Sequence, residues 1–189
     1  MKPETRKEEI IKTAAKLFKE KGYSAVTMRD IAKTVGVKAA SLYNHISSKQ
    51  EILKEIIISI AEDFTKGLEV IKSSSVSSLE KLSKIITLHI KISSENTDGM
   101  ASLNNDWMHL EDQLEYYLKL RTEYENNFRD ILKQGVDNNE LLSDNPDVML
   151  FSMLSTLRSL YIWIPKKEDL NPAELEESLS NVLINGINK

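Results

Sequence analysis

The sequence predicts an all-α fold of about nine helices, in which a small three-helix head precedes a larger helical body. Apolar residues recur every three or four positions along most of the 189 residues, which is the period of an amphipathic helix. No stretch shows the alternating pattern of a strand. Charge also divides the chain, because residues 1–55 hold twelve Lys and Arg against seven Asp and Glu, a net +5, and the remainder carries −9 of the total of −4.

The first helix is predicted over residues 5–21. Its apolar side chains fall on one side, at Ile10, Ile11, Ala14, Leu17 and Phe18. Gly22 follows in the position that commonly ends a helix. We expect this helix to buttress the segment that comes next.

The stretch from Thr27 to Lys49 is the most informative part of the sequence. It predicts two short helices joined by a tight turn, and the first helix has one apolar face, at Met28, Ile31, Ala32 and Val35. Thr27 can cap that helix with its hydroxyl, and Asp30 suits its first turn. Gly36 supplies the permissive backbone of the turn. This is a helix-turn-helix pattern.

The second of these helices has a tip suited to a DNA major groove. Small residues let the backbone approach base edges, and polar groups can bind them. Val37 and Leu42 are expected to hold this helix to the first one. The outward residues are small, polar or cationic: Lys38, Ala39, Ala40, Ser41, Tyr43, Asn44 and His45.

These residues together resemble the DNA-binding head of the TetR family of bacterial transcriptional regulators. The matching positions are Thr27, Ile31 with Ala32, Gly36 with Val37, Leu42 with Tyr43, and Ser48 with Lys49. The resemblance covers about residues 6–55. It implies a DNA-binding domain over residues 1–50 and a ligand-binding and dimerisation domain over residues 51–189.

The resemblance also implies roles for the head residues. Thr27, Tyr43 and Lys49 would hold phosphates, with Lys38 adding a cation nearby, while the other tip residues would approach bases: Ala39, Ala40, Ser41, Asn44 and His45. For Lys49 the alternative is an ordinary solvated lysine. Lys38 replaces the family's usual Ser or Thr cap, Ala40 a common glycine and Ile46 a common aromatic residue, so the operator cannot be read by analogy.

The body is predicted to be a series of helices. Ser48 and Glu51 form a capping box that starts a long helix reaching at least Phe64. A serine-rich loop at 73–78, a helix at 79–92 and a polar break at 93–99 follow. A short helix is expected at 103–110, a long one at 114–136, one from Asn145 to about Ile164, and a last one capped by Asn171.

The helix before Ile164 is apolar on nearly every side, so one intramolecular face cannot cover it. The TetR resemblance implies that the last two helices form a dimer interface, which would place two reading heads on a palindrome. The expected interface residues are Met153, Leu157, Leu160, Tyr161, Leu179, Val182 and Leu183. The alternative is the buried core of a monomer.

The resemblance further implies a small-molecule pocket in the body. Residues that combine apolar bulk with a polar handle are the candidates to line it: Trp107, Met108, His109, Tyr117, Arg121, Tyr124 and Trp163. Residues 100–165 loosely resemble the bodies of TetR regulators of lipid and acyl-CoA catabolism, which implies an apolar or acyl-type effector. Each of these residues can instead be ordinary core. Arg121 lies on or beside an apolar stripe and therefore needs a partner.

Other classes of function find little support. Asp106 and His109 have metal-capable spacing but no defined third ligand, the chain has no cysteine, and no nucleotide fingerprint or nucleophile elbow is present. We therefore expect no enzyme activity, no metal and no cofactor. The charged start, MKPETRKEEIIK, lacks the apolar run of a signal peptide, which favours the cytoplasm and no membrane association.

The sequence thus predicts a homodimeric regulator, most simply a repressor, released from a palindromic operator by a small effector. The alternative is a helical carrier or interaction module with a non-functional DNA-binding head.

Overall fold

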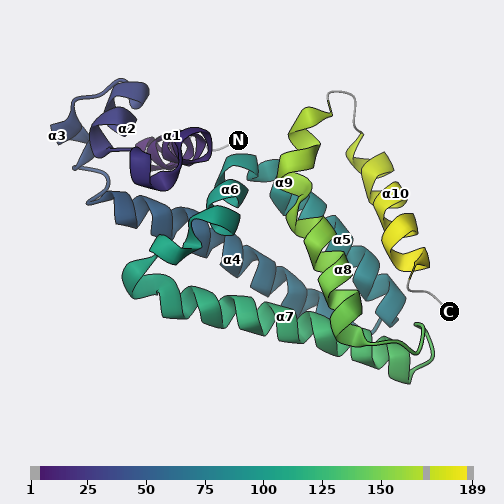
Figure 1. Cartoon of the computed structure of the whole chain (residues 1–189). Coiled ribbons are helices and arrows are strands. Elements are labelled where there is room, and N and C mark those ends of the chain that lie inside the picture. The colour runs from purple at the N-terminus through teal and green to yellow at the C-terminus, as the bar shows by residue number, and fades with distance from the viewer. Residues whose placement is uncertain (1–4, 168–170, 187–189) are drawn as a thin grey trace. The chain divides into compact units, whose positions relative to one another are not determined.

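A computed structural model describes residues 5–167 and 171–186 of the chain (Figure 1). These residues form helices connected by short turns and contain no strand, which confirms the predicted all-α class. Helix α9 follows α8 after one residue, so the two can be counted as one interrupted helix. Counted in this way, the described part of the chain contains nine α-helices.

The N-terminal part of the chain that the structure describes contains four α-helices and one 3-10 turn. They are α1 (Arg6–Lys21), the 3-10 turn η1 (Tyr23–Ala25), α2 (Met28–Val35), α3 (Ala39–Leu42) and α4 (Lys49–Ser73). The rest of the chain forms α5 (Ser78–Glu95), α6 (Thr97–Asn105), η2 (Trp107–His109), η3 (Glu111–Gln113), α7 (Leu114–Asp137), α8 (Pro146–Arg158), α9 (Leu160–Trp163), η4 (Ile164–Lys166) and α10 (Pro172–Asn185).

Local sequence signals explain where several helices begin and end. Helix α1 is followed by the C-cap Gly22 as predicted, and its buried face contains the predicted stripe except Ile11, which is half-buried, together with Ala15. Thr27 caps the start of α2 and Gly36 caps its end, with a φ of 78° that lies in the left-handed region that glycine adopts without strain. Asn145 and Asn171 cap α8 and α10, each followed by a proline in the first turn.

The start of α4 differs in detail from the predicted capping box. The hydroxyl of Ser48 accepts a hydrogen bond from the backbone N–H of Glu51 at 3.0 Å, as expected. The Glu51 carboxylate, however, accepts from the backbone and hydroxyl of Ser47 at 2.7 and 2.5 Å. These bonds from Ser47, its hydroxyl above all, hold the pKa of Glu51 below its usual value.

The segment around residue 100 corrects the sequence prediction. The expected polar break at 93–99 and short helix at 103–110 are wrong, because α6 already begins at Thr97 and the chain then makes two 3-10 turns. Gly99, which reads as a helix breaker, lies inside α6. A side chain there would lie 2.7 Å from the Cδ1 atom of Ile60 on α4, so glycine permits close packing of the two helices.

Helix α8 stops at Arg158 rather than running unbroken to Ile164. By length and composition alone, Pro146–Lys166 could cross a membrane, and 39% of that window is buried inside the chain. A core helix of a water-soluble protein passes the same test, so this stretch is weak evidence for a membrane span.

The chain divides into two compact units. The first combines residues up to Ala61 with Asn96–Leu118, and the second combines Glu62–Glu95 with the chain from Lys119 onward. The boundary expected near residue 50 lies inside the first unit, and the assignment of separate tasks to the two domains stays a prediction.

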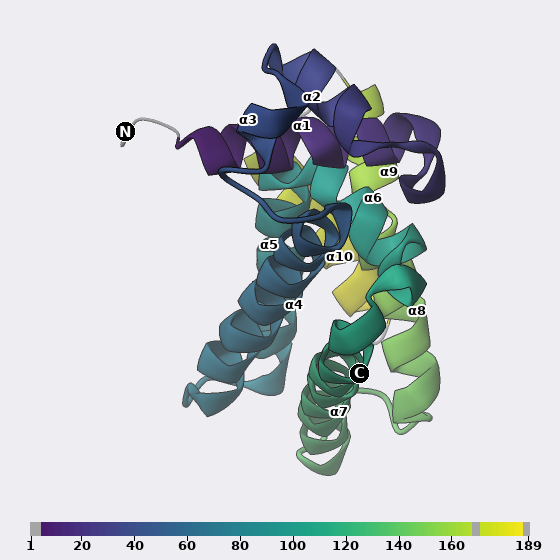
Figure 2. The ribbon, with the colours of Figure 1, turned by 90° about the vertical axis from the view of Figure 1, so that its left-hand side faces the viewer.

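In the first unit, α1, α2 and α3 pack together around Ile10, Phe18, Ile31 and Leu42, all buried (Figure 2). Helix α6 packs on α1 in the same unit, and Lys19 of α1 forms an ion pair with Asp98 of α6 at 2.8 Å. The three-helix head therefore folds together with a helix that begins more than fifty residues after the end of α3 in the sequence.

Candidate nucleic-acid interface and body cavity

Thr27 is held firmly at the start of α2. Its hydroxyl accepts from the backbone N–H of Asp30 at 3.2 Å and donates to the Asp30 carboxylate at 2.6 Å. The same carboxylate accepts from the backbone N–H of Thr27 at 2.9 Å. These bonds lower the pKa of Asp30. Thr27 therefore acts as a cap here, which fixes where the free N–H groups of α2 point.

The predicted reading tip, residues 38–41 with 43–45, lies at the surface and is held in place by buried residues. Leu42 and Ile46 are buried and hold the α3 segment to the head. Helix α3 is short, ending at Leu42, and Lys38 makes no side-chain cap, as its identity predicts. The tip residues that face solvent are Lys38, Ala40, Tyr43, Asn44 and His45, whereas Ala39 and Ser41 are half-buried.

Tyr43 has 53% of its surface exposed although it is aromatic. Its position directly after the buried Leu42 places a phenol at the edge of the reading tip. An exposed phenol can donate to a phosphate oxygen, and such contacts position a protein on DNA without reading sequence.

Lys49 does not project freely into solvent. Its Nζ atom donates to the backbone oxygens of Tyr23 and Val26, at 2.9 Å each. The ammonium also lies 4.2 Å from the centroid of the Tyr23 ring, a cation–π distance. The lysine expected to hold a phosphate is thus bound by its own head.

The sequence analysis did not single out Tyr23, which lies at the centre of a cluster in the first unit. The Tyr23 ring stacks on His109 with centroids 5.2 Å apart and meets Phe18 edge-on at 5.1 Å. Burial raises the pKa of Tyr23, and the charges of Glu111 and Asp106 raise it further. Burial also raises the pKa of Asp106, although hydrogen bonds from Ser102 and from the Tyr23 backbone oppose the shift. No local pattern marks Tyr23, because its partners are distant in sequence.

The residues expected to bind a ligand fall into both units. In the first unit, Trp107 stacks on Tyr117 at 5.9 Å and His109 stacks on Tyr23, while Met108 is 57% exposed. The other three belong to the second unit: Arg121, Tyr124 and Trp163.

The second unit contains a buried polar pair. The Nε2 atom of His89 lies 2.7 Å from the hydroxyl of Tyr124, and the Phe64 ring packs on both residues. Burial, together with the nearby charge of Arg158, lowers the pKa of His89 to about 3. Burial also raises the pKa of Tyr124. Both side chains are therefore neutral at ordinary pH.

Two arginines share one carboxylate in this unit. An Oε1 atom of Glu125 lies 3.2 Å from Arg121 Nε and 2.7 Å from Arg158 Nη2. Burial pushes the pKa of Glu125 upward, but the hydrogen bond and charge of Arg158, with help from Arg121, bring it below its usual value. Glu125 is thus a partner of Arg121, as the position of that arginine beside an apolar stripe requires.

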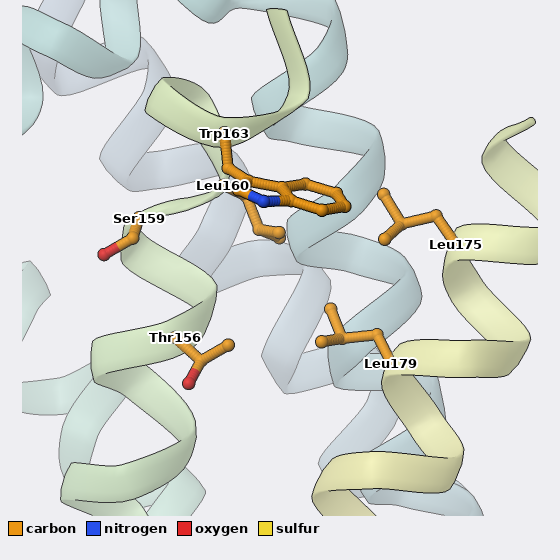
Figure 3. Close-up of a pocket in the computed structure, with 6 residues that line it drawn as sticks. All are labelled: Thr156, Ser159, Leu160, Trp163, Leu175 and Leu179. Atoms are coloured by element: carbon orange, nitrogen blue, oxygen red, sulfur yellow. The ribbon is translucent and has the colours of Figure 1, made fainter. Parts of the chain in front are cut away.

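Trp163 lines an apolar groove of about 220 Å³ in the second unit. Its indole and the side chains of Leu175 and Leu179 point into the space between α9 and α10 (Figure 3). The hydroxyls at the rim are already used, because Thr156 donates to the Ser152 carbonyl and Ser159 to the Ser155 carbonyl. The groove therefore offers apolar contacts and few polar ones.

The structure changes the picture of the proposed dimer surface. Met153, Leu157, Leu160 and Tyr161 are buried within a single chain, so they are core and not surface. Leu179 and Leu183 are half-buried, and Val182 is 71% exposed. The sequence did not predict this burial because α8 has apolar residues on nearly every side. Periodicity alone does not say which side of such a helix packs against the rest of the same chain.

A different face of α8 and α9 is exposed. Helical spacing places Val148, Phe151 and Ile162 on one side, with three serines between them: Ser152, Ser155 and Ser159. Phe151 is 72% exposed and Val148 57%.

Within the described residues, no group of three or more His, Cys, Asp or Glu side chains could hold a metal ion.

Two family models match the chain. The model described as "Bacterial regulatory proteins, tetR family" matches residues 10–56, and the model described as "Tetracyclin repressor-like, C-terminal domain" matches residues 75–187. Together they cover the reading head and nearly all of the body.

Known proteins agree with these matches. The HTH-type transcriptional repressor KstR2 of Rhodococcus jostii is 28% identical over 151 residues, which is 79% of this chain and 74% of KstR2. The biofilm operon regulator IcaR of Staphylococcus aureus is 49% identical over 51 residues, 27% of each chain. The structure of the ketosteroid transcriptional regulator KstR2 of Mycobacterium tuberculosis superimposes with a TM-score of 0.91 at 22% identity, covering 98% of this chain and 96% of that one. PfmR from Thermus thermophilus gives 0.82 at 26% identity, with 95% and 99% covered.

Proposed function

The chain belongs to the TetR family of bacterial regulatory proteins, and on this premise we propose that it is a homodimeric transcriptional repressor whose release from a palindromic operator is triggered by a small effector. As a member of this family it is a regulator and not an enzyme. The proposal places it in the cytoplasm, where its operator is.

The observation that carries the proposal is the exposed reading tip. Tyr43, Asn44 and His45 face solvent directly after the buried anchor Leu42, so polar side chains are presented from a rigid support. Asn44 can pair with adenine in the major groove, and Lys38 adds a cation beside it. The basic head on an acidic body fits the same function.

A dimer is supported by the exposed face of α8 and α9. Large apolar residues exposed together are unusual on a monomer, and here Phe151, Val148 and Ile162 share one face with small serines that permit close helix packing. A two-fold dimer would place two reading tips about one DNA turn, roughly 34 to 36 Å, apart.

An apolar or acyl-type effector is supported by the groove at Trp163. Its lining is apolar and its rim hydroxyls are occupied by backbone carbonyls, so it favours hydrocarbon over a polar solute. Arg158, next to the rim residue Ser159, supplies a cation in the same unit for an effector that also carries an anionic group. The effector can act only by binding one conformation of the dimer more tightly than the other.

Selection of binding sites from a random pool of duplex DNA tests this function. We expect the purified protein to enrich a palindrome with half-sites one helical turn apart. Lack of enrichment even at low salt, where phosphate contacts alone give some binding, would instead support a helical carrier with an inactive head.

A further inference from the structure

Five residues of the first unit form a contact network that we call the clamp: Tyr23, Lys49, Gln50, Asp106 and His109. It joins three segments that are distant in sequence, namely η1, the start of α4 and the η2 turn. The Asp106 carboxylate lies near the backbone N–H of Tyr23, and Gln50 Nε2 donates to the His109 carbonyl at 2.8 Å.

Lys49 is the centre of the clamp on the head side. Two of its three N–H groups are directed at the carbonyls of Tyr23 and Val26, and its charge faces the Tyr23 ring. An ammonium held in this way gives up much of its ability to neutralise a phosphate, because binding DNA would require breaking these contacts or competing with them.

His109 is the centre on the η2 side. Its ring stacks on Tyr23 while its carbonyl accepts from Gln50, so side chain and backbone are both attached to the head. Two residues on, Glu111 has a φ of 44°, a left-handed conformation that is uncommon for a non-glycine residue. Such a conformation persists where surrounding contacts determine it, which fits a turn fixed in place by the clamp.

We propose that Tyr23, Lys49 and His109 are positioning residues that bind the η2 turn to the reading head, and that Lys49 acts through this clamp and not by contacting phosphate. The clamp makes the conformation of residues 106–110 and the placement of η1, which leads directly into α2, mutually dependent. Helix α7 begins at Leu114, five residues after His109, so a change in α7 has a short covalent route to the head. The linkage between the η2 turn and the head does not depend on DNA binding. The claim that Lys49 does not contact phosphate rests on the proposed DNA-binding function.

Amide hydrogen exchange of the full chain tests the linkage without DNA. Lys49→Met keeps the apolar stem and removes the charge, and His109→Ala removes the stacked ring. Each variant should speed exchange on the far side of the clamp, by roughly three- to tenfold. For Lys49→Met that side is residues 107–110, and for His109→Ala it is residues 23–26.

Matched controls separate this effect from general loosening. Lys38→Met makes the same charge change at an exposed tip residue, and Asp112→Ala removes an exposed side chain close to the η2 turn. Neither should alter exchange in the clamp, and peptides from α8 serve as an internal reference. If a variant unfolds the head, Gln50→Ala removes only one hydrogen bond and answers the same question. Exchange that changes only next to each mutated residue would overturn the linkage.

The salt dependence of DNA binding tests the second claim, with the selected operator duplex as the probe. Lys38→Met should lower the slope of log affinity against log salt by about 0.9 for each phosphate that the variant no longer neutralises, whereas Lys49→Met should weaken binding and leave the slope unchanged. An equal loss of slope in both variants would assign Lys49 to phosphate and overturn the claim. If the wild-type protein binds no DNA, the proposed function fails, and the exchange experiment still decides whether the clamp exists.

Discussion

The Nε2 atom of His89 lies 2.7 Å from the Tyr124 hydroxyl, and both side chains are almost completely buried. One hydrogen bond therefore joins the neutral imidazole to the phenol. A proton added to the ring would be a buried charge beside Arg158, which explains why the pKa of His89 is lowered to about 3.

Stability should therefore fall as the pH is lowered. Below pH 6.5 the unfolded chain takes up a proton on His89, whereas the folded chain does not until about pH 3. Unfolding is thus favoured by acid, by about 2 kcal/mol between pH 7.5 and pH 5 from this one group. Urea unfolding of the wild-type protein and of His89→Gln at pH 7.5 and pH 5 measures this change in the free energy of unfolding. An identical pH dependence in the variant would show that His89 does not contribute.

Thr27→Ala should destabilise the head. The change removes the hydroxyl that accepts from the Asp30 N–H, and losing such a cap costs about 1 kcal/mol. Thermal unfolding measures the loss, and Thr27→Ser should restore most of it. Thr34→Ala is the matched control, because Thr34 also lies in α2 but only donates to the Asp30 carbonyl. Equal effects at the two positions would argue against a special role for the cap.

Tyr43→Ala should weaken binding to every DNA sequence alike. A phosphate contact carries no base information, so operator and scrambled duplexes should lose the same factor, roughly fivefold for one hydrogen bond. Asn44→Ala is the informative comparison, because loss of a base contact should reduce operator binding far more than binding to scrambled DNA. Fluorescence anisotropy at fixed salt gives both ratios. A changed base preference in Tyr43→Ala would contradict the phosphate role.

The sequence predicted the head better than the body for a physical reason. Thr27, Gly36 and Gly22 act through their own backbone neighbours, so a short window contains the whole interaction. The contacts of Tyr23 with His109, and of Gly99 with Ile60, join segments that are distant in sequence, and no window contains both partners. Apolar periodicity located α8 but could not distinguish its covered side, with Leu157, from its exposed side, with Phe151.

Trp163→Ala should weaken effector binding at the groove. Dodecanoyl-CoA is a suitable probe, because it combines an apolar chain with anionic phosphates. In a Trp107→Phe background the fluorescence of Trp163 alone reports binding. Removing the indole should raise the dissociation constant roughly tenfold or more, since burying an aromatic side chain contributes about 1.5 to 3 kcal/mol. Because Trp163→Ala removes the fluorescent group, calorimetry measures the dissociation constant of this variant. Unchanged affinity would place the acyl chain elsewhere in the body.

Phe151→Glu should convert the dimer to a monomer. The phenylalanine is 72% exposed on the face that we assign to the partner subunit, so a dimer would bury two copies of it. Replacing them introduces two carboxylates into an apolar contact, where unpaired charge is costly. Sedimentation velocity should show the change in mass, and operator affinity should fall because one head contacts only half a site. Leu142→Glu makes a comparable change at a residue 40% exposed between α7 and α8, and it should remain dimeric. A Phe151→Glu protein that sediments as a dimer would show that the two chains meet through another surface.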